Sequence, residues 1–362
     1  MTKFKVTIFG AGNLGSALAV ALNKTGVFAV QMIDPSEDAL ERFRRLDLDV
    51  AIRAFPAGGD LHLLLEGQDL AVAAVPDGSV AQIAAAAARA GTHYLDFVCT
   101  DPQARTILEP LSERRAVLLG CGVSPGFIGN VGCGLLRGCS DVADLTLRVG
   151  ALPRFATNRL GYGQIWNIDG LIDEYTRPGV AIRDGRITPI SPLEEYGQIA
   201  IDGVTYEEFT TSGGVEDLEI FSGPALRNVT FKTLRYPGHL DYMRFLLDDL
   251  GLRQRRDMLK SLLYNGLPLV EDDVLMLVAT ARGYIGRQPT GRTVVYRFSP
   301  GIAPAPFNAL TSVASGYAAS LIAMLHEGEI APRGIIAHHL IDTELLLSRD
   351  FLRPLFLRSP PV

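Results

Sequence analysis

One stretch near the start of the chain constrains its fold more than any other. Residues 5–9 read as a buried strand that runs straight into Gly10-Ala11-Gly12-Asn13-Leu14-Gly15. An apolar helix over 16–22 follows, and a second apolar run, 28–33, ends on Asp34. A glycine-rich turn between strand and helix, with an acidic residue after the next strand, is typical of a dinucleotide-binding βαβ unit. The sequence therefore predicts a Rossmann domain.

Each position of this motif has a physical role. Gly10 permits the tight turn, Gly12 lets the backbone approach a pyrophosphate at the helix N-terminus, and Gly15 lets helix and strand pack closely. We place Asn13 and Leu14, between these glycines, in the same cofactor-binding loop. Asp34 is expected to accept hydrogen bonds from the adenosine ribose. Its carboxylate would repel a 2′-phosphate, which favours NAD over NADP.

Composition limits the class of protein. The chain has 362 residues, 48% of them apolar and 20% charged, so two domains with a large core are expected. A net charge of −6 without a basic block disfavours nucleic acid and anionic membranes as partners. No segment reads as a signal peptide or as a run of roughly 20 apolar residues, so we expect a cytoplasmic protein. Four cysteines without a Cys-x-x-Cys motif indicate buried thiols and no metal site.

The pattern of strands and helices changes along the chain. Strands and helices alternate through residue 122, as a parallel sheet requires, whereas residues 123–308 show strands without regular helices between them. Within this second part, 200–211 reads as a strand and Asp184-Gly185 as a hairpin turn. We predict an α/β doubly wound Rossmann domain over 1–122 and an α+β domain with a mixed or antiparallel sheet over 123–308. A small, apolar helix over 309–327 and the tail to residue 362 are expected to return to the first domain, and His338-His339 to lie at the surface.

Candidate ligand-binding residues follow from this architecture. Ligands of open α/β sheets bind beyond the carboxyl ends of the strands, and the second domain is expected to close that cleft. The candidates at the strand ends are Val75, Pro76, Asp77, Asp96 and Gly122. The candidates in the second domain are Trp166, Asp169, Glu174, Thr211, Ser212, Gly213, Arg235 and His239. Each also has a structural reading, as a core residue, a turn, a helix start or a structural ion pair.

Five motifs in order carry a resemblance over nearly the full length. They are Gly120-Cys121-Gly122-Val123-Ser124-Pro125-Gly126, Val149-Gly150-Ala151-Leu152-Pro153, Gly170-Leu171-Ile172-Asp173-Glu174-Tyr175, Thr211-Ser212-Gly213-Gly214 and Lys232-Thr233-Leu234-Arg235-Tyr236-Pro237-Gly238-His239. With these motifs the chain resembles the saccharopine dehydrogenase-like family, and within it the lysine 6-dehydrogenases. The resemblance implies a Rossmann domain, a mixed-sheet substrate domain, a homodimer or larger oligomer, and redox chemistry at a carbon–nitrogen bond.

Three positions bear on the branch of the family. Saccharopine-forming reductases carry Asp before the Pro-Gly, whereas Ser124 stands there in this chain, which favours the lysine dehydrogenases. Trp166 matches a tryptophan that lines the saccharopine pocket of the reductases. Ala337-His338-His339 replaces the Pro followed by Glu that is usual in the family.

The implied reaction is NAD-dependent oxidation of an amine, which for L-lysine gives an aldehyde and ammonia. A lysine amine has a pKa of about 10.4, so neutralising it at pH 7 costs roughly 4.6 kcal/mol and calls for a base. His239 is preferred on pKa grounds, with Glu174, Asp169 and Asp96 as alternatives. Arg235 is the candidate to clamp the substrate α-carboxylate, with Thr211, Ser212 and Gly213 adding donors. Asp169, Asp173 or Glu174 is expected to hold an ammonium group.

Two other functions stay open. A saccharopine or carboxynorspermidine dehydrogenase would act on a secondary amine, and would need more cationic side chains in the pocket. A non-catalytic NAD-binding sensor would have a filled or blocked second-domain cleft.

Overall fold

A computed structural model describes residues 3–55, 59–98, 102–137, 142–215, 217–221, 226–285, 287–300 and 307–356. Cys99 and Cys139 lie outside this set. The chain divides into two compact units, which are described separately below. Among the described residues, the first unit contains 3–127, 307 and 311–354, and the second contains 128–300, 308–310, 355 and 356. The first unit thus continues to Phe127, past the boundary that we predicted at residue 122.

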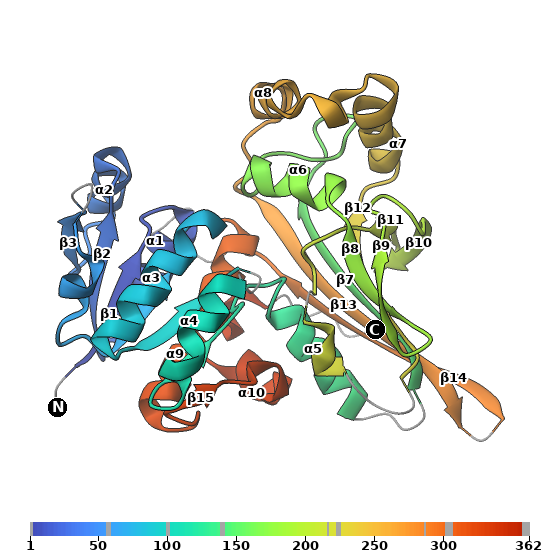
Figure 1. Ribbon diagram of the computed structural model, residues 1–362. Coiled ribbons are helices and arrows are strands. Elements are labelled where there is room, and N and C mark those ends of the chain that lie inside the picture. The colour runs from blue at the N-terminus through green and yellow to red at the C-terminus, as the bar shows by residue number, and fades with distance from the viewer. Residues whose placement is uncertain are drawn as a thin grey trace. The chain divides into compact units, whose positions relative to one another are not determined.

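The first unit is built on parallel strands joined by helices (Figure 1). Its strands are β1 (Phe4–Phe9), β2 (Phe28–Asp34), β3 (Ala51–Ala54), β4 (Leu70–Ala73), β5 (His93–Asp96), β6 (Ala116–Leu118) and β15 (Gly334–Ile335). Its helices are α1 (Asn13–Asn23), α2 (Glu37–Arg44), α3 (Asp77–Ala90), α4 (Pro102–Ser112), α9 (Ala309–Glu327, mostly in this unit) and α10 (Thr343–Ser348). A short 3-10 helix at Leu61–Leu65 lies between β3 and β4.

The strand order of this sheet is β15-β6-β5-β4-β1-β2-β3, and every pairing in it is parallel. The order reverses between β1 and β4, which is the switch point where dinucleotides bind in Rossmann folds. β4 and β5 are buried at every position, as strands covered on both faces must be. The predicted α/β fold is therefore confirmed, with β15 as an added edge strand.

The second unit is built on a mixed sheet. Its strands are β7 (Val142–Pro153), β8 (Gly179–Arg183), β9 (Arg186–Ile190), β10 (Gly197–Ile201), β11 (Val204–Thr210), β12 (Asn228–Arg235), β13 (Asp273–Ile285) and β14 (Gln288–Phe298). Its helices are α5 (Phe127–Arg137, mostly in this unit), α6 (Ile168–Thr176), α7 (His239–Arg244) and α8 (Arg256–Gly266). The order is β10-β11-β12-β7-β13-β14, with β8 pairing β12 and β9 pairing β8. β7 and β12 are parallel and the other described pairs are antiparallel.

Two turns test the predictions for this sheet. Asp184 and Gly185 both have positive φ, 49° and 76°, and close the β8–β9 hairpin as the Asp-Gly pair predicts. The single strand predicted over 200–211 is wrong. Asp202 and Gly203, again an Asp-Gly pair with positive φ, break it into the hairpin β10–β11.

Helix α9 coincides with the predicted helix over 309–327. It is long and apolar enough to pass a length-and-hydropathy test for a membrane span, but 83% of the tested window is buried inside the protein, as in a core helix. Within the second unit, the Asp273 carboxylate accepts hydrogen bonds from the first two backbone N–H groups of α9. A negative charge at a helix N-terminus satisfies donors that have no partner inside the helix.

His338 is buried, so the prediction that it lies at the surface is wrong. Its Nδ1 lies 2.8 Å from the Tyr317 hydroxyl and its Nε2 lies 2.7 Å from the Leu119 carbonyl oxygen. Tyr317 belongs to α9, and Leu119 directly follows β6. The imidazole therefore joins the C-terminal part of the first unit to the loop that begins at Gly120. Burial lowers the pKa of His338 to about 4, so the ring is neutral at pH 7.

Candidate active site

The glycine-rich turn has the geometry that a dinucleotide requires. A Cβ atom on Gly10 would lie 2.1 Å from the Ala74 carbonyl oxygen, and one on Gly15 would lie 2.0 Å from the Gly10 carbonyl oxygen. A Cβ atom on Gly12 would meet nothing within 4 Å. Gly10 and Gly15 thus have no room for a side chain because of the fold itself, whereas the space beside Gly12 is free for a ligand. Gly12 also caps α1, whose first turn holds Asn13 and Leu14.

Asp34 stands beside this turn, at the end of β2. One carboxylate oxygen accepts a hydrogen bond from the Ala11 N–H at 2.7 Å, and the other accepts one from the Ser36 N–H at 2.7 Å. The carboxylate is thereby fixed next to the helix N-terminus and remains half-exposed. Since the residues present fit the binding of a dinucleotide, a nicotinamide cofactor can be held here by the α1 N-terminus and Asp34.

The other predicted strand-end residues surround the same sheet edge. Val75 and Pro76 follow β4, and Pro76 is the N-cap of α3, whose first residue is Asp77. Gly122 lies in a loop that closes on itself, since it forms a bridge with Gly126 and its carbonyl accepts the Phe127 N–H at 2.9 Å. All belong to the first unit.

Asp96 is the last residue of β5 and is 1% exposed. Its carboxylate accepts a hydrogen bond from the Gly120 N–H at 2.7 Å, so it fixes the start of the loop that contains Gly122. Burial raises the pKa of Asp96 to about 7, although the Gly120 and Tyr94 hydrogen bonds oppose the shift. A carboxyl group that titrates near neutrality at the cofactor edge of a Rossmann sheet is a reasonable acid or base.

The second unit gathers its candidate residues around Arg235, the last residue of β12. The guanidinium is 2% exposed. It donates from Nε to the Tyr175 hydroxyl at 2.7 Å, from one terminal nitrogen to the Thr233 hydroxyl and the Leu234 carbonyl, and from the other to a Glu174 oxygen at 3.1 Å. Four of its five N–H groups are thereby engaged by described residues. The predicted bidentate clamp on a substrate carboxylate would need two free N–H groups, so Arg235 does not fit that role in this arrangement.

His239 is the first residue of α7. It contacts Tyr175 and is 0% exposed. Its Nε2 lies 2.9 Å from the Tyr175 hydroxyl, and its Nδ1 lies 2.8 Å from the Leu160 carbonyl oxygen. A carbonyl only accepts, so Nδ1 carries the proton. Burial and the nearby Arg235 lower the pKa of His239 to about 3, which leaves Nε2 unprotonated. The Tyr175 hydroxyl therefore donates to His239 and accepts from Arg235.

These contacts correct the expectation for His239. The preference for it as base rested on its ordinary pKa, which is close to neutrality. The structure gives it no exposed nitrogen and a strongly lowered pKa, because it sits in the interior beside a permanent cation. Its ring is placed to orient Tyr175 rather than to meet a substrate.

Glu174 is the acidic member of this cluster and its side chain is 13% exposed. Burial raises the pKa of the Glu174 carboxyl, while Arg235 and the Thr233 and Thr211 hydroxyls act in the opposite direction. Of the two predicted base candidates in this unit that the structure brings together, Glu174 and His239, only Glu174 retains access to solvent.

Two aromatic residues border the cluster. The Arg235 guanidinium carbon lies 4.7 Å from the centroid of the Tyr162 ring, a cation–π geometry. Trp166 donates from its indole nitrogen to the Tyr162 hydroxyl at 3.1 Å and is 39% exposed. Trp166 thus presents an apolar surface next to the buried charges, as a substrate pocket requires.

Thr211, Ser212 and Gly213 follow β11, and Ser212 contacts helix α6. The Ser212 hydroxyl donates to the Asp173 carbonyl at 3.0 Å and its N–H donates to the Glu174 carbonyl at 3.1 Å. Thr211 is buried, and Gly213 is exposed with a φ of 76°. Ser212 therefore holds the helix end that carries Glu174, and its hydroxyl is already engaged.

The predicted acidic cluster is divided by the structure. The Asp169 carboxylate pairs with Lys260 at 2.6 Å and with Arg256 at 3.5 Å, both on α8. Asp173 pairs with Arg256 and Arg177. Only Glu174 faces Arg235, because consecutive helical residues are rotated by about 100° and Asp173 and Glu174 point to different neighbours. Asp169 is therefore not brought to the cluster, and Asp169 and Asp173 are neutralised by these cations rather than free to hold an ammonium group.

Tyr162, Tyr175 and Thr233 belong to the site but were not predicted as site residues from the sequence. Tyr175 and Thr233 lie inside motifs that the resemblance rests on, so a usable signal was present. No local pattern marks Tyr162. Among the described residues, no group of three His, Cys, Asp or Glu side chains could hold a metal ion.

Comparisons with known proteins agree with this arrangement. A family model described as the saccharopine dehydrogenase NADP binding domain matches residues 6–116, and one described as the saccharopine dehydrogenase C-terminal domain matches residues 122–355. The second match covers more than half of the chain.

The chain was also compared with solved structures. Apo saccharopine dehydrogenase (L-Glu forming) from Saccharomyces cerevisiae superposes with a TM-score of 0.80 at 14% identity, covering 98% of this chain and 99% of the other. A myo-inositol dehydrogenase from Corynebacterium glutamicum gives a TM-score of 0.45 at 11% identity, covering 99% and 100%. The fold, the dinucleotide turn and the two family matches together show that this chain belongs to the saccharopine dehydrogenase family of NAD(P)-dependent amino acid dehydrogenases.

Proposed function

We propose that this protein catalyses the NAD-dependent oxidative deamination of an amino acid side-chain amine, with L-lysine oxidised at its ε-carbon. The observation that carries the proposal is the Glu174–Arg235 pair. It places one partly exposed carboxylate beside a buried guanidinium, with the buried Tyr162 ring and the partly exposed Trp166 next to them.

The reaction needs a proton acceptor before it needs a hydride acceptor. An ammonium group has no lone pair to stabilise the cation that forms as hydride leaves its carbon. Glu174 is the proposed base, since it is the acidic side chain of the cluster and burial raises its pKa toward that of a useful proton acceptor. Arg235 keeps the carboxylate oriented, and its positive charge opposes the rise in the Glu174 pKa that burial causes.

The residues then act in a defined order. Glu174 accepts a proton from the ε-ammonium, which leaves a neutral amine with a lone pair. Bound NAD supplies the acceptor for the hydride that leaves the ε-carbon. The substrate is then an iminium ion. Water adds to its carbon, ammonia leaves, and the aldehyde cyclises to piperideine-6-carboxylate. Glu174 returns its proton to solvent or to the leaving amine.

The choice of NAD over NADP rests on Asp34. Its carboxylate is fixed beside the Gly12 turn by the Ala11 and Ser36 N–H groups. A 2′-phosphate there would face a fixed negative charge at short range. Asp77, a second acid in the same unit, begins α3.

The charge balance around Arg235 favours lysine over saccharopine. Saccharopine carries three carboxylates and would need surplus cations. In the described residues the guanidinium of Arg235 is already matched by Glu174. A dehydrogenase of the saccharopine or carboxynorspermidine type, acting on a secondary amine, is the second candidate.

A non-catalytic NAD-binding sensor is the third candidate. It would bind cofactor at the Gly12 turn without turning over any amine. Glu174, Trp166 and Arg235 would then serve only structure. The proposal also includes a homodimer or larger homo-oligomer in the cytoplasm, and light scattering of the purified protein tests the oligomeric state.

The test is NADH formation by the purified protein with L-lysine, L-ornithine, saccharopine and carboxynorspermidine, using NAD and NADP. The variants Glu174→Gln and Asp173→Asn make the same carboxylate-to-amide change at adjacent positions of α6. Lysine turnover that Glu174→Gln abolishes and Asp173→Asn retains supports the proposal. Turnover of secondary amines alone would select the second candidate, and NAD binding without turnover would select the third.

A further inference from the structure

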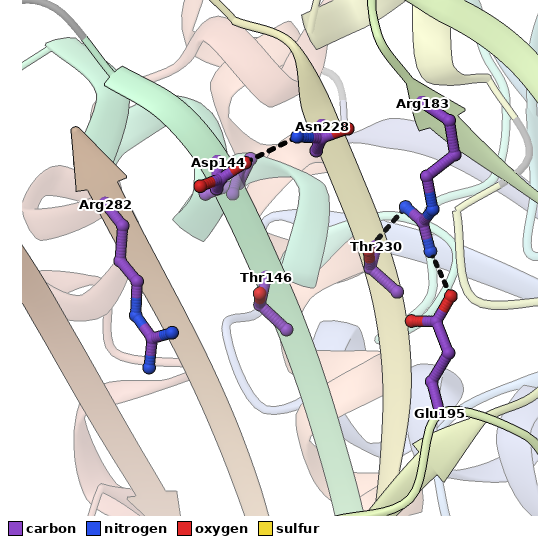
Figure 2. Close-up of a pocket in the computed structure, with 8 residues that line it drawn as sticks. Asp144, Thr146, Arg183, Glu195, Asn228, Thr230 and Arg282 are labelled. Atoms are coloured by element: carbon purple, nitrogen blue, oxygen red, sulfur yellow. Dashed lines mark hydrogen bonds and ion pairs between the residues drawn. The ribbon is translucent and has the colours of Figure 1, made fainter.

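A second polar site lies on the mixed sheet, away from Glu174 and Arg235. It is a shallow cavity of about 250 Å³ lined by Asp144, Leu145, Thr146, Arg183, Glu195, Asn228, Thr230 and Arg282 (Figure 2). Asn228 and Arg235 stand at opposite ends of β12. Seven steps along the strand separate them by roughly 20 Å, and the alternation of side chains puts them on opposite faces of the sheet. The cavity is therefore distinct from the proposed catalytic cluster.

The register of the sheet explains why these side chains meet. Asp144 on β7 is the cross-strand partner of both Arg282 on β13 and Asn228 on β12. Two residues further along these strands, Thr146 on β7 is the partner of Thr230 on β12. Since alternate residues of a strand share a face, these five side chains form the floor and one wall of the cavity, as Figure 2 shows. Arg183 and Glu195 form the opposite wall.

The polar groups of the cavity differ in how fully they are engaged. The Arg183 guanidinium pairs with Glu195 and donates to the Thr230 hydroxyl at 2.7 Å. One oxygen of Asp144 accepts from the Asn228 amide at 2.6 Å. Within the part of the chain that the structure describes, Arg282 makes no ion pair or side-chain hydrogen bond, and neither does the Thr146 hydroxyl.

Arg282 and Asp144 are cross-strand neighbours of opposite charge, yet no ion pair joins them among the described residues. In Figure 2 the Arg282 side chain runs along β13 toward the level of Thr146, while the Asp144–Asn228 pair lies at the other end of the cavity. The cavity thus offers a cationic donor and a hydroxyl at one end, and a carboxylate acceptor at the other. This is the complement of a molecule that carries a carboxylate and an ammonium group on the same carbon atom.

We propose that this cavity binds a small zwitterionic amino acid. The ligand carboxylate accepts hydrogen bonds from Arg282 and Thr146, and the ligand ammonium donates to Asp144. The volume suits an amino acid of small size and excludes a nucleotide. Because the site is shallow and partly open to water, we expect a dissociation constant in the millimolar range, about that of a metabolite sensor.

Glycine is the probe, because it has no side-chain amine and so lacks the group that the proposed reaction oxidises. Binding is measured on the full chain by saturation-transfer NMR, without NAD. Acetate carries only the carboxylate and methylammonium only the ammonium, so each should bind at least tenfold more weakly than glycine. Arg282→Gln and Asp144→Asn should each weaken glycine binding by about tenfold, as expected when one charged hydrogen bond is lost.

Two matched variants distinguish binding in this cavity from a general effect of surface charge and from binding at the catalytic cluster. Arg292→Gln makes the same change on β14, at a residue that does not line the cavity, and should leave glycine binding unchanged. Glu174→Gln should also leave it unchanged, whatever its effect on catalysis. Equal binding by wild type and Arg282→Gln, acetate binding as tight as glycine binding, or a loss in Glu174→Gln would each overturn the proposal.

Discussion

The Nε2 atom of His239 lies 2.9 Å from the hydroxyl oxygen of Tyr175, deep inside the second unit. Nδ1 donates a hydrogen bond to the Leu160 carbonyl, so Nε2 accepts one from the tyrosine hydroxyl, and the tyrosine oxygen in turn accepts from Arg235 at 2.7 Å. Each hydrogen bond in this series has only one possible donor. The orientation of the Arg235–Glu174 pair therefore depends on two neutral side chains that never reach the substrate.

The first prediction concerns Tyr175. Tyr175→Phe removes the hydroxyl and leaves two buried polar groups, the Arg235 Nε–H and His239 Nε2, without that partner. The free energy of unfolding should fall by about 2–3 kcal/mol, as expected when buried polar groups lose their hydrogen bonds. The kcat for the amine should fall by at least tenfold with a smaller change in KM, because Glu174 loses its orientation. Tyr264→Phe, at a side chain that is 62% exposed, is the control and should match wild type in both measurements.

The second prediction concerns the proposed base. Glu174→Gln keeps the shape of the side chain but cannot accept the ammonium proton. We expect kcat to fall by about 100- to 1,000-fold, the usual contribution of a general base. Asp173→Asn removes a carboxylate that pairs with Arg256 at the surface, so its kcat should stay within about twofold of wild type. Thermal unfolding of both variants checks folding, and equal losses of kcat in the two would argue against Glu174 as base.

The third prediction concerns Gly12, which is proposed to be needed for cofactor binding but not for the stability of the fold. Gly12→Ala places a methyl group in open space, so the unfolding temperature should stay within a degree or two of wild type. The same methyl group would stand where a pyrophosphate approaches, and NADH affinity should fall by at least tenfold in fluorescence titrations. Gly266→Ala, which also meets nothing within 4 Å but lies in the second unit, should bind NADH normally. Unchanged NADH affinity in Gly12→Ala would place the cofactor elsewhere.

The fourth prediction follows from the raised pKa of Asp96. The folded protein holds this proton up to about pH 7, whereas the unfolded chain releases it near pH 4. Between these values the folded state binds more protons than the unfolded state, so stability from this group falls as pH rises. From pH 5 to pH 8 the loss should be on the order of 3 kcal/mol in urea unfolding. Asp96→Asn should remove this part of the pH dependence and the exposed Asp77→Asn should not; equal slopes for wild type and Asp96→Asn would contradict it.

The fold was predictable where a local sequence pattern is enough to specify a strand, a helix or a turn. The turn at Gly10–Gly15, the buried strands and α9 all follow from apolar periodicity and glycine placement, and their bounds agree to within a few residues. Two errors share a cause, since short-range patterns do not report tertiary neighbours. Residues 200–211 read as one strand because the Asp202-Gly203 turn is flanked by apolar residues on both sides. His338 is polar and followed by another histidine, yet Leu119 and Tyr317 meet it in the interior.

The sequence predicted which residues belong to the site, but not what each of them does there. Arg235, Glu174 and His239 were named from motifs, and the structure brings all three together. Their roles depend on burial, which no linear pattern encodes. The sequence suggests that His239 is a base, but both of its ring nitrogens form hydrogen bonds inside the protein. It suggests that Arg235 binds a substrate carboxylate, but four of its N–H groups already have partners among the described residues. Asp169 was grouped with Glu174 by proximity in sequence, but it faces α8.

The most direct test of the proposed function is the rate of NADH formation from L-lysine at pH 7 and pH 10, for wild type and Glu174→Gln in parallel. We expect turnover with NAD well above turnover with NADP. We also expect the defect of Glu174→Gln to shrink at pH 10, where solution base has already neutralised much of the lysine amine. A Glu174→Gln variant as active as wild type at pH 7, or a wild type that oxidises only secondary amines, would contradict the proposal.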